Sequence, residues 1–323
     1  MEIAPVVLAP LAGGPATVEL AAAVADAGGV GFVAAGYLAP DALEERLREA
    51  RRRTEGILGV NLFVLEEGPV DEAALAAYRE ELRDEGPLGE PVFDDDALGE
   101  KLEIAIAAGV QVVSTTFGPP PPGLVAAARA AGLDVWATVA SARDARAAVA
   151  AGADALVAQG AEAGGHRASF DDLDEDDLPL LDLLAALRAA TDLPLVAAGG
   201  IADRAAARAA REAGAAAVQA GTAFLLCPEA GTSAPHRSAL ARPGETAMTR
   251  AFTGRRARGI VNRFMRDHPA APSAYPHVHH LTAPLRAAAR AAGDADRINL
   301  WAGTRFADAR AVPAADVVAS LAV

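Results

Sequence analysis

The residues best suited to chemistry lie in one short segment, Gly164-Gly165-His166, which follows an apolar run ending in Gln159. Successive glycines permit backbone conformations and close approaches that other residues forbid. Histidine is the side chain whose ordinary pKa suits proton transfer near neutral pH. The segment therefore predicts a cofactor-binding loop that also presents His166 as a catalytic base. The alternative is a turn histidine that bonds only to its own loop.

Two further glycine-rich turns predict an anion site. Gly199-Gly200 follows an apolar strand and precedes Asp203 at an expected helix start, and Gly221-Thr222 follows the next strand. Backbone N–H groups of such turns, beside a short helix, make a cradle for a phosphate. Either pair alone is more typical of a plain turn, but the two together indicate a phosphate-bearing ligand.

Two amides, Asn61 and Gln159, lie within or at the end of apolar strands. A buried amide without partners costs about 1–3 kcal/mol. These amides either satisfy each other and the backbone, or they bond to the edge of a heteroaromatic ring such as an isoalloxazine. No Gly-x-Gly-x-x-Gly motif opens a helix after the first strand, which argues against a nicotinamide cofactor bound in that way. One phosphate and one ring suit FMN.

The remaining reactive side chains predict no metal site and no second nucleophile. His277, His279 and His280 are close in sequence but lack Asp, Glu or Cys companions at ligand spacing. The single cysteine, Cys227, ends an apolar run and is expected in the core.

Composition limits the partners and the setting. The chain has 323 residues, 52% of them hydrophobic, and a formal net charge of −14, which argues against a nucleic-acid partner. One cysteine allows no internal disulfide. The amino terminus, Met1-Glu2-Ile3-Ala4-Pro5, lacks the basic flank of a signal peptide, and no apolar run is long enough to span a membrane. We expect a soluble, cytoplasmic monomer or homodimer acting on a small molecule.

The elements that must position these residues alternate regularly. Eight short apolar runs are each followed by an Ala-rich helical stretch or a longer excursion; the runs are residues 6–9, 30–34, 59–64, 110–116, 134–139, 155–158, 195–198 and 217–226. Continuous apolar runs are typical of parallel strands buried on both faces. Eight such units predict an α/β fold, a TIM (β/α)8 barrel. A doubly wound open sheet is the alternative.

The alternation stops after Cys227, and the region beyond it shows no strand periodicity. We predict three parts: an FMN-binding barrel over residues 1–227, a mainly helical cap with the substrate region over 228–297, and a segment over 298–323 that packs back on the barrel. Active sites of such barrels lie at the carboxyl ends of the strands. The C-terminal cap is therefore expected to cover that face.

Several motifs in one order resemble the bacterial nitronate monooxygenase family, formerly called 2-nitropropane dioxygenase. They are residues 9–14 (APLAGG), the strand with Asn61, 161–167 (AEAGGHR), 197–201 (AAGGI), 219–222 (QAGT), 250–255 (RAFTGR) and 300–303 (LWAG). The resemblance implies a TIM barrel with a helical cap and non-covalent FMN. It assigns FMN contacts to Ala9, Pro10, Leu11, Ala12, Gly13, Asn61, Gln159, Gly164, Gly165, Gly199, Gly200, Gln219, Ala220, Gly221 and Thr222.

The resemblance also implies a reaction. A nitronate, the anion of a nitroalkane, would reduce FMN, and O2 would then complete its conversion to a carbonyl compound and nitrite. His166 would lie over the flavin, protonated or donating a hydrogen bond to a nitronate, or removing the α-proton of a neutral nitroalkane. Trp301, Thr116 and Thr304 are the expected substrate contacts. Thr116 and Thr304 stand where relatives often carry His and Gln.

Two other functions share these features. An FMN-dependent enoyl-thioester reductase has the same barrel and a Gly-Gly-His loop but takes electrons from NADH or NADPH. A flavin-binding protein without turnover is the third possibility, because Thr116 and Thr304 depart from the family pattern.

Overall fold

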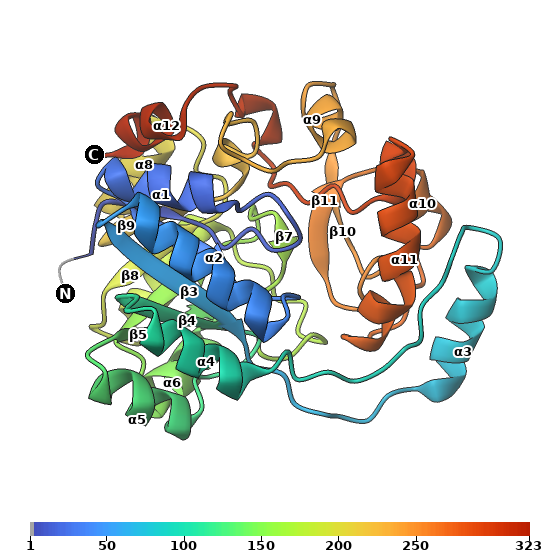
Figure 1. Cartoon of the computed structure of the whole chain (residues 1–323), viewed down its shortest axis with the longest axis horizontal. Helices are drawn as coiled ribbons and strands as arrows, with labels where there is room; N and C mark the ends of the chain where they lie inside the picture. Colours follow the sequence, from blue (N-terminus) through green and yellow to red (C-terminus); the bar gives the residue numbers. More distant parts are fainter. Residues whose placement is uncertain (1–2) are drawn as a thin grey trace.

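The computed structural model describes residues 3–323, so Met1 and Glu2 of the amino-terminal segment lie outside the described residues. Eight parallel strands form a closed barrel in the order β1-β2-β3-β4-β5-β6-β8-β9 (Figure 1). The strands are β1 (Val6–Leu8), β2 (Val30–Ala34), β3 (Ile57–Phe63), β4 (Val112–Thr116), β5 (Asp134–Val139), β6 (Ala155–Gln159), β8 (Leu195–Ala198) and β9 (Ala217–Ala220). The predicted TIM barrel is confirmed, and the open doubly wound sheet is excluded by the pairing of β1 with β9.

Helices join the strands and pack around the barrel. They are α1 (Val18–Asp26), α2 (Pro40–Arg53), α4 (Leu98–Ala107), α5 (Pro122–Ala130), α6 (Ala142–Ala151), α7 (Leu180–Arg188) and α8 (Arg204–Glu212). Side-chain caps fix several of their starts: the Asp203 carboxylate accepts from the N–H of Ala206 at α8, and the Thr17 hydroxyl accepts from the N–H of Leu20 at α1.

The strand side chains alternate between two apolar layers. Val7, Phe32 and Trp136 belong to the cluster that fills the barrel interior. Val6 and Leu8 belong to the larger cluster that packs strands against helices. Both faces of each strand are therefore buried, which explains why the strands appear in the sequence as continuous apolar runs. Cys227 is fully buried in the larger cluster, as expected, and burial raises the pKa of its thiol to about 12.

The last barrel strand is shorter than the sequence predicts. β9 ends at Ala220, and the chain then forms the 3₁₀ turn η1 (Thr222–Phe224), so the expected strand over residues 217–226 is wrong in its second half. The apolar residues of that half, such as Phe224 and Leu225, are buried as part of a turn. A short apolar run does not distinguish strand from turn by periodicity.

The region after the barrel contains helices and a small sheet. The helices are α9 (Ala234–Leu240), α10 (Arg263–Asp267), α11 (His277–Ala291) and the 3₁₀ turn η2 (Ala295–Arg297). The sheet joins β10 (Thr246–Thr249) to β11 (Ala257–Ile260) and β11 to β7 (Gly165–His166), all antiparallel. The predicted mainly helical cap therefore also contains a small sheet that the sequence did not reveal, because strands of four residues paired with a distant loop leave no local periodicity.

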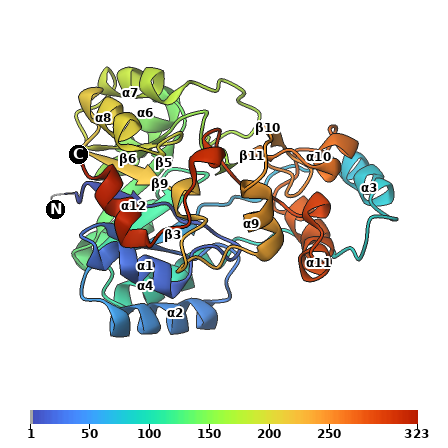
Figure 2. The same ribbon diagram turned by 90° about the horizontal axis from the view of Figure 1, so that it is seen from above.

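The cap also includes α3 (Glu72–Glu81), from the excursion after β3. Figures 1 and 2 show α3 beside α10 and α11, away from the barrel. Leu75 and Tyr78 share an apolar cluster with Phe252 and Phe264, and the Tyr78 hydroxyl donates to the carbonyl of Ala251 at 2.6 Å. The cap is thus assembled from two distant parts of the sequence.

The end of the chain returns to the barrel. After η3 (Phe306–Asp308), α12 (Ala314–Leu321) packs its buried residues, including Val317 and Leu321, into the cluster between strands and helices. Within residues 3–323, no helix combines the length and apolar character needed to cross a membrane.

Candidate active site

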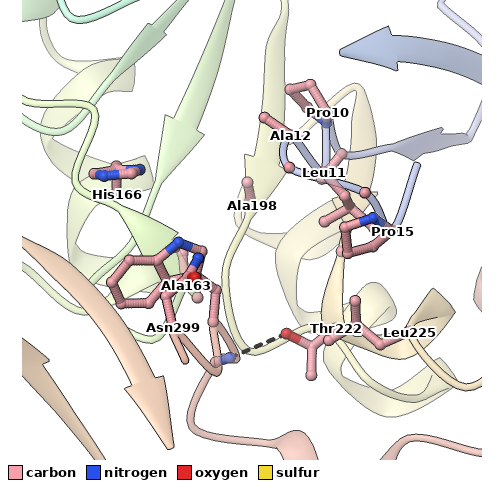
Figure 3. Close-up of a pocket in the computed structure, with 18 of the residues that line it drawn as sticks. Pro10, Leu11, Ala12, Pro15, Ala163, His166, Ala198, Thr222, Leu225 and Asn299 are labelled. Atoms are coloured by element: carbon pink, nitrogen blue, oxygen red, sulfur yellow. Dashed lines mark hydrogen bonds between the residues drawn. The ribbon is translucent and has the colours of Figure 1, made fainter. Parts of the chain in front are cut away.

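A cavity of about 450 Å³ lies where the carboxyl ends of the strands face the cap. It brings together residues at or just after the carboxyl ends of all eight barrel strands, and others from α11; Figure 3 shows several of the lining residues around the opening. The sequence-predicted residues that line it are Ala9, Pro10, Leu11, Ala12, Gly13, Asn61, Thr116, Gln159, Gly164, Gly165, His166, Gly199, Gly200, Gln219, Ala220, Gly221, Thr222 and Trp301.

Thr304 is placed elsewhere. Its side chain is exposed, it does not line the cavity, and its N–H donates to the carbonyl of Glu162 at 3.0 Å. The expected substrate contact through Thr304 is therefore not supported: the backbone of this residue is used to attach the carboxyl-terminal segment to the loop before His166.

Gly164 of the Gly-Gly-His loop allows a close backbone contact, whereas Gly165 is needed for its φ of +77°. A Cβ on Gly164 would lie 2.4 Å from the carbonyl carbon of Ala302, and one on Gly303 would lie 2.6 Å from the carbonyl oxygen of Glu162. The N–H of Gly303 also donates to the Thr222 hydroxyl at 3.0 Å, a bond drawn in Figure 3. Segment 302–303 thus lies directly against both the loop and η1, where only glycine fits.

His166 is held in place from three sides. Its backbone pairs with Ala257 of β11, and its Nε2 lies 2.9 Å from the Thr253 hydroxyl oxygen. Rings of Phe117, Tyr275 and Trp301 surround the imidazole at centroid distances of 5.8, 5.7 and 5.5 Å. These rings cover much of the half-buried imidazole, and desolvation, with a smaller effect of the charge on Arg255, lowers the pKa of His166 to about 3.

The ring of His166 is consequently neutral at pH 7 in the ligand-free protein. The Thr253 hydroxyl is within 3.3 Å of the Arg255 carbonyl; when it donates there, Nε2–H of His166 donates to Thr253 and Nδ1 carries no proton. A protonated imidazole, one of the forms expected with an anionic substrate, is disfavoured until an anion enters and raises the pKa.

Asn61 has one end of its amide fixed by protein. Its Oδ1 accepts from the hydroxyls of Ser114 at 2.8 Å and Thr116 at 2.9 Å, both on the neighbouring strand β4. Because both oxygen sites are taken, the Nδ2 donors remain for whatever occupies the cavity that Asn61 lines. Thr116 therefore orients Asn61, a role that its sequence position alone did not indicate.

Gln159 is used mainly within its own loop. Its Oε1 accepts from the N–H of Ala168 at 2.9 Å and from Arg167 at 3.2 Å, and its Nε2 donates to the carbonyl of His166 at 3.0 Å. Most hydrogen bonds of the Gln159 amide are therefore made within the protein, as the alternative to ring binding predicted. Gln219, in contrast, lines the cavity with no side-chain hydrogen bond to any described residue.

The two glycine turns meet at one end of the cavity. Gly199 and Gly200 have φ values of +113° and +67°, in the region that favours glycine. The first N–H groups of η1, beginning at Thr222, have no acceptor within the turn. Both turns line the same cavity, so their donors face a shared space of the kind that binds phosphate.

Sequence reasoning missed the contribution of the cap and the strand β2 loop. Tyr37, Phe117, His279 and Arg286 all line the cavity. Tyr37 has φ +67°, stacks on His279 with ring centroids 3.9 Å apart, and accepts a hydrogen bond from Tyr275 at 3.2 Å. No local pattern marks these positions, since they reach the cavity only through the tertiary fold.

The similarity of this chain to known proteins extends over its whole length. The profile of the nitronate monooxygenase family matches residues 1–323. A nitronate monooxygenase of Pseudomonas aeruginosa is 40% identical, with 98% of this chain and 95% of the relative covered. The crystal structure of a nitroalkane oxidase from Streptomyces ansochromogenes superposes with a TM-score of 0.95 at 46% identity, over 99% of this chain and 94% of that one.

A more distant structure shares the fold. FabK from Thermotoga maritima superposes with a TM-score of 0.78 at 24% identity, over 99% of this chain and 92% of that one. That likeness concerns the barrel and cap alone. The full-length family match and the two closer relatives agree with each other, and the chain belongs to the nitronate monooxygenase family.

Proposed function

We propose that this enzyme oxidises alkyl nitronates, with FMN as cofactor and O2 as co-substrate, to carbonyl compounds and nitrite. One observation carries the proposal: a single cavity combines oriented amide donors, a glycine-rich anion cradle and a neutral histidine enclosed by aromatic rings. Its relatives are named for nitronate and nitroalkane oxidation.

The residues present fit FMN. The turns at Gly199-Gly200 and Gly221-Thr222 would hold the phosphate, and Asn61 and Gln219 would bond to polar atoms of the ring edge. Ala9 to Gly13 and Gly164-Gly165 would contact the cofactor through small side chains and backbone. When bound, FMN supplies the electron acceptor that the protein side chains themselves lack.

His166 and Trp301 would form the substrate side of the site. Their rings are 5.5 Å apart, and both line the cavity. A nitronate arrives deprotonated, so His166 needs only to donate a hydrogen bond or take up a proton as the anion binds. With a neutral nitroalkane, its unprotonated nitrogen would accept the α-proton.

Anaerobic mixing of the flavin-loaded protein with an alkyl nitronate tests the proposal. We expect bleaching of the flavin absorbance within seconds, and nitrite and carbonyl product once O2 is admitted. Faster bleaching by NADH or NADPH than by nitronate would instead assign the enoyl-thioester reductase activity. A protein that binds flavin but is reduced by none of these donors would be a flavin-binding protein without turnover.

A further inference from the structure

Arg286, on α11, is a buried cation that no carboxylate of the described residues neutralises. Arg286 is only 7% exposed. No Asp or Glu oxygen of residues 3–323 lies within 4.0 Å of the guanidinium nitrogens. A buried charge without a partner is costly, and it is retained where a ligand supplies the opposite charge. Arg286 lines the active-site cavity.

The protein orients this guanidinium but leaves part of it free. Nε donates to the Thr282 hydroxyl at 3.0 Å, and Nη2 donates to the carbonyl of His279 at 2.9 Å. Nη1 has no hydrogen-bond partner among the described residues. Burial lowers the pKa of Arg286 to about 10, so the group is still a cation at neutral pH.

The surroundings favour an anion over a second cation. His279 accepts at Nδ1 from Arg286 at 3.3 Å, and burial beside Arg286 lowers the pKa of His279, so that ring stays neutral. Tyr37 and Tyr275 are neutral phenols in the same wall, and desolvation raises the pKa of Tyr37 to about 12. The charge of Arg286 is therefore not cancelled on the cavity side.

We propose that Arg286 determines the specificity of the site for anionic substrates, binding the oxygens of a nitronate through its free guanidinium edge and so selecting the anion over the neutral nitroalkane. The proposal rests on the proposed function for the identity of the substrate. The free Nη1 carries two N–H donors, and hydrogen bonds from a guanidinium to an oxyanion are among the strong ones. No bond is made or broken at Arg286.

Nitrate, a planar oxyanion that the enzyme cannot oxidise, is the probe. Its dissociation constant is measured from the change in flavin absorbance of the loaded protein. We expect Arg286→Met to weaken nitrate binding about 10- to 100-fold, the range for a hydrogen bond to a charged group, and Arg286→Lys to weaken it less. Arg290→Gln is the matched control, since Arg290 lines the same cavity one turn along α11 but is exposed.

Steady-state kinetics supply the second measurement. Arg286→Met should raise KM for the nitronate more than it lowers kcat, and should reduce the preference for nitronate over the neutral nitroalkane. Unchanged nitrate affinity in Arg286→Met, or an equal loss in Arg290→Gln, would overturn the proposal. If Arg286→Met does not fold, Arg286→Lys takes its place, and unchanged nitrate affinity in that variant would overturn the proposal. Nitrate binding through Arg286 without nitronate turnover would instead refute only the proposed function.

Discussion

At the scale of single residues, the active site depends on groups that the protein keeps neutral or leaves partly unbonded. His166 is neutral because packing against aromatic rings desolvates the imidazole, and Asn61 offers its donors because two hydroxyls occupy its oxygen. Both features follow from neighbours distant in sequence. Residue identity predicted many of the side chains that line the cavity, but their protonation and orientation required the structure.

Replacing His166 should separate binding from turnover. We expect His166→Asn to retain flavin, because the glycine turns and Asn61 are untouched, and to lower kcat/KM for nitronate by about 10²-fold or more. Thr253→Val, which removes the partner of Nε2 and two longer bonds to the Arg255 backbone but keeps the imidazole, is the milder control. Flavin content and nitrite release measure the two effects, and wild-type kcat/KM in His166→Asn would exclude His166 from the reaction.

Asn61 should contribute to flavin affinity through its oriented donors. We expect Asn61→Ala to weaken flavin binding about tenfold, the effect of losing one hydrogen bond of intermediate strength. Ser114→Ala leaves Thr116 to hold the Asn61 oxygen and should have a smaller effect. Titration of flavin into the stripped protein gives the dissociation constants; equal constants for Asn61→Ala and the wild-type protein would show that Asn61 does not contact the ring.

At the scale of elements, the carboxyl-terminal segment holds the Gly-Gly-His loop in place. Gly164 and Gly303 allow two backbones to touch, while β7 joins the loop to the cap sheet. The loop is thus part of the barrel by sequence and part of the cap by hydrogen bonding.

A methyl group at this contact should separate the two backbones. Gly164→Ala places a Cβ 2.4 Å from the carbonyl carbon of Ala302, so segment 302–303 must move; we expect a lower Tm and weaker flavin binding. Gly123→Ala in α5 meets no atom within 4 Å and is the matched control, expected to leave both unchanged or raise the Tm slightly. Thermal unfolding followed by flavin fluorescence measures both, and equal behaviour of the two variants would contradict the contact.

At the scale of the whole molecule, buried neutral histidines make the fold sensitive to acid. Burial lowers the pKa of His236 to about 4 and that of His166 to about 3, below the value near 6.5 of an unfolded chain. Between the lowered pKa values and pH 6.5, the unfolded state therefore binds more protons than the folded state. Stability is complete above pH 6.5 and is lost progressively as the pH falls toward 4.

His236→Asn should reduce this acid sensitivity. His236 is 6% exposed, and its protonation penalty in the folded state corresponds to about 2 kcal/mol at pH 4.5. We expect the fall in Tm between pH 7 and pH 4.5 to be smaller in His236→Asn than in wild-type protein. The exposed Arg242→Gln variant, which removes no charge that acts on His236, serves as the reference, and an identical fall in Tm in all three proteins would contradict a contribution from His236.

Much of the fold was predictable, because local patterns determine barrel strands and their helices. Apolar runs identified all eight strands, and Asp203 identified the start of α8. The pairing of β7 with β11, the attachment of α3 to the cap and the position of Arg286 were not predictable. Each depends on contacts between segments far apart in the chain, which no local pattern records.

The division of the cap between two parts of the chain has a consequence for biosynthesis. The hydroxyl of Tyr78 in α3 bonds to a carbonyl 173 residues later, after all eight barrel strands. During translation α3 emerges early and has no partner for its apolar face until the chain beyond Ala251 has left the ribosome. The eight strands can pair first, and the cap over the cavity is completed only when its second part has been synthesised.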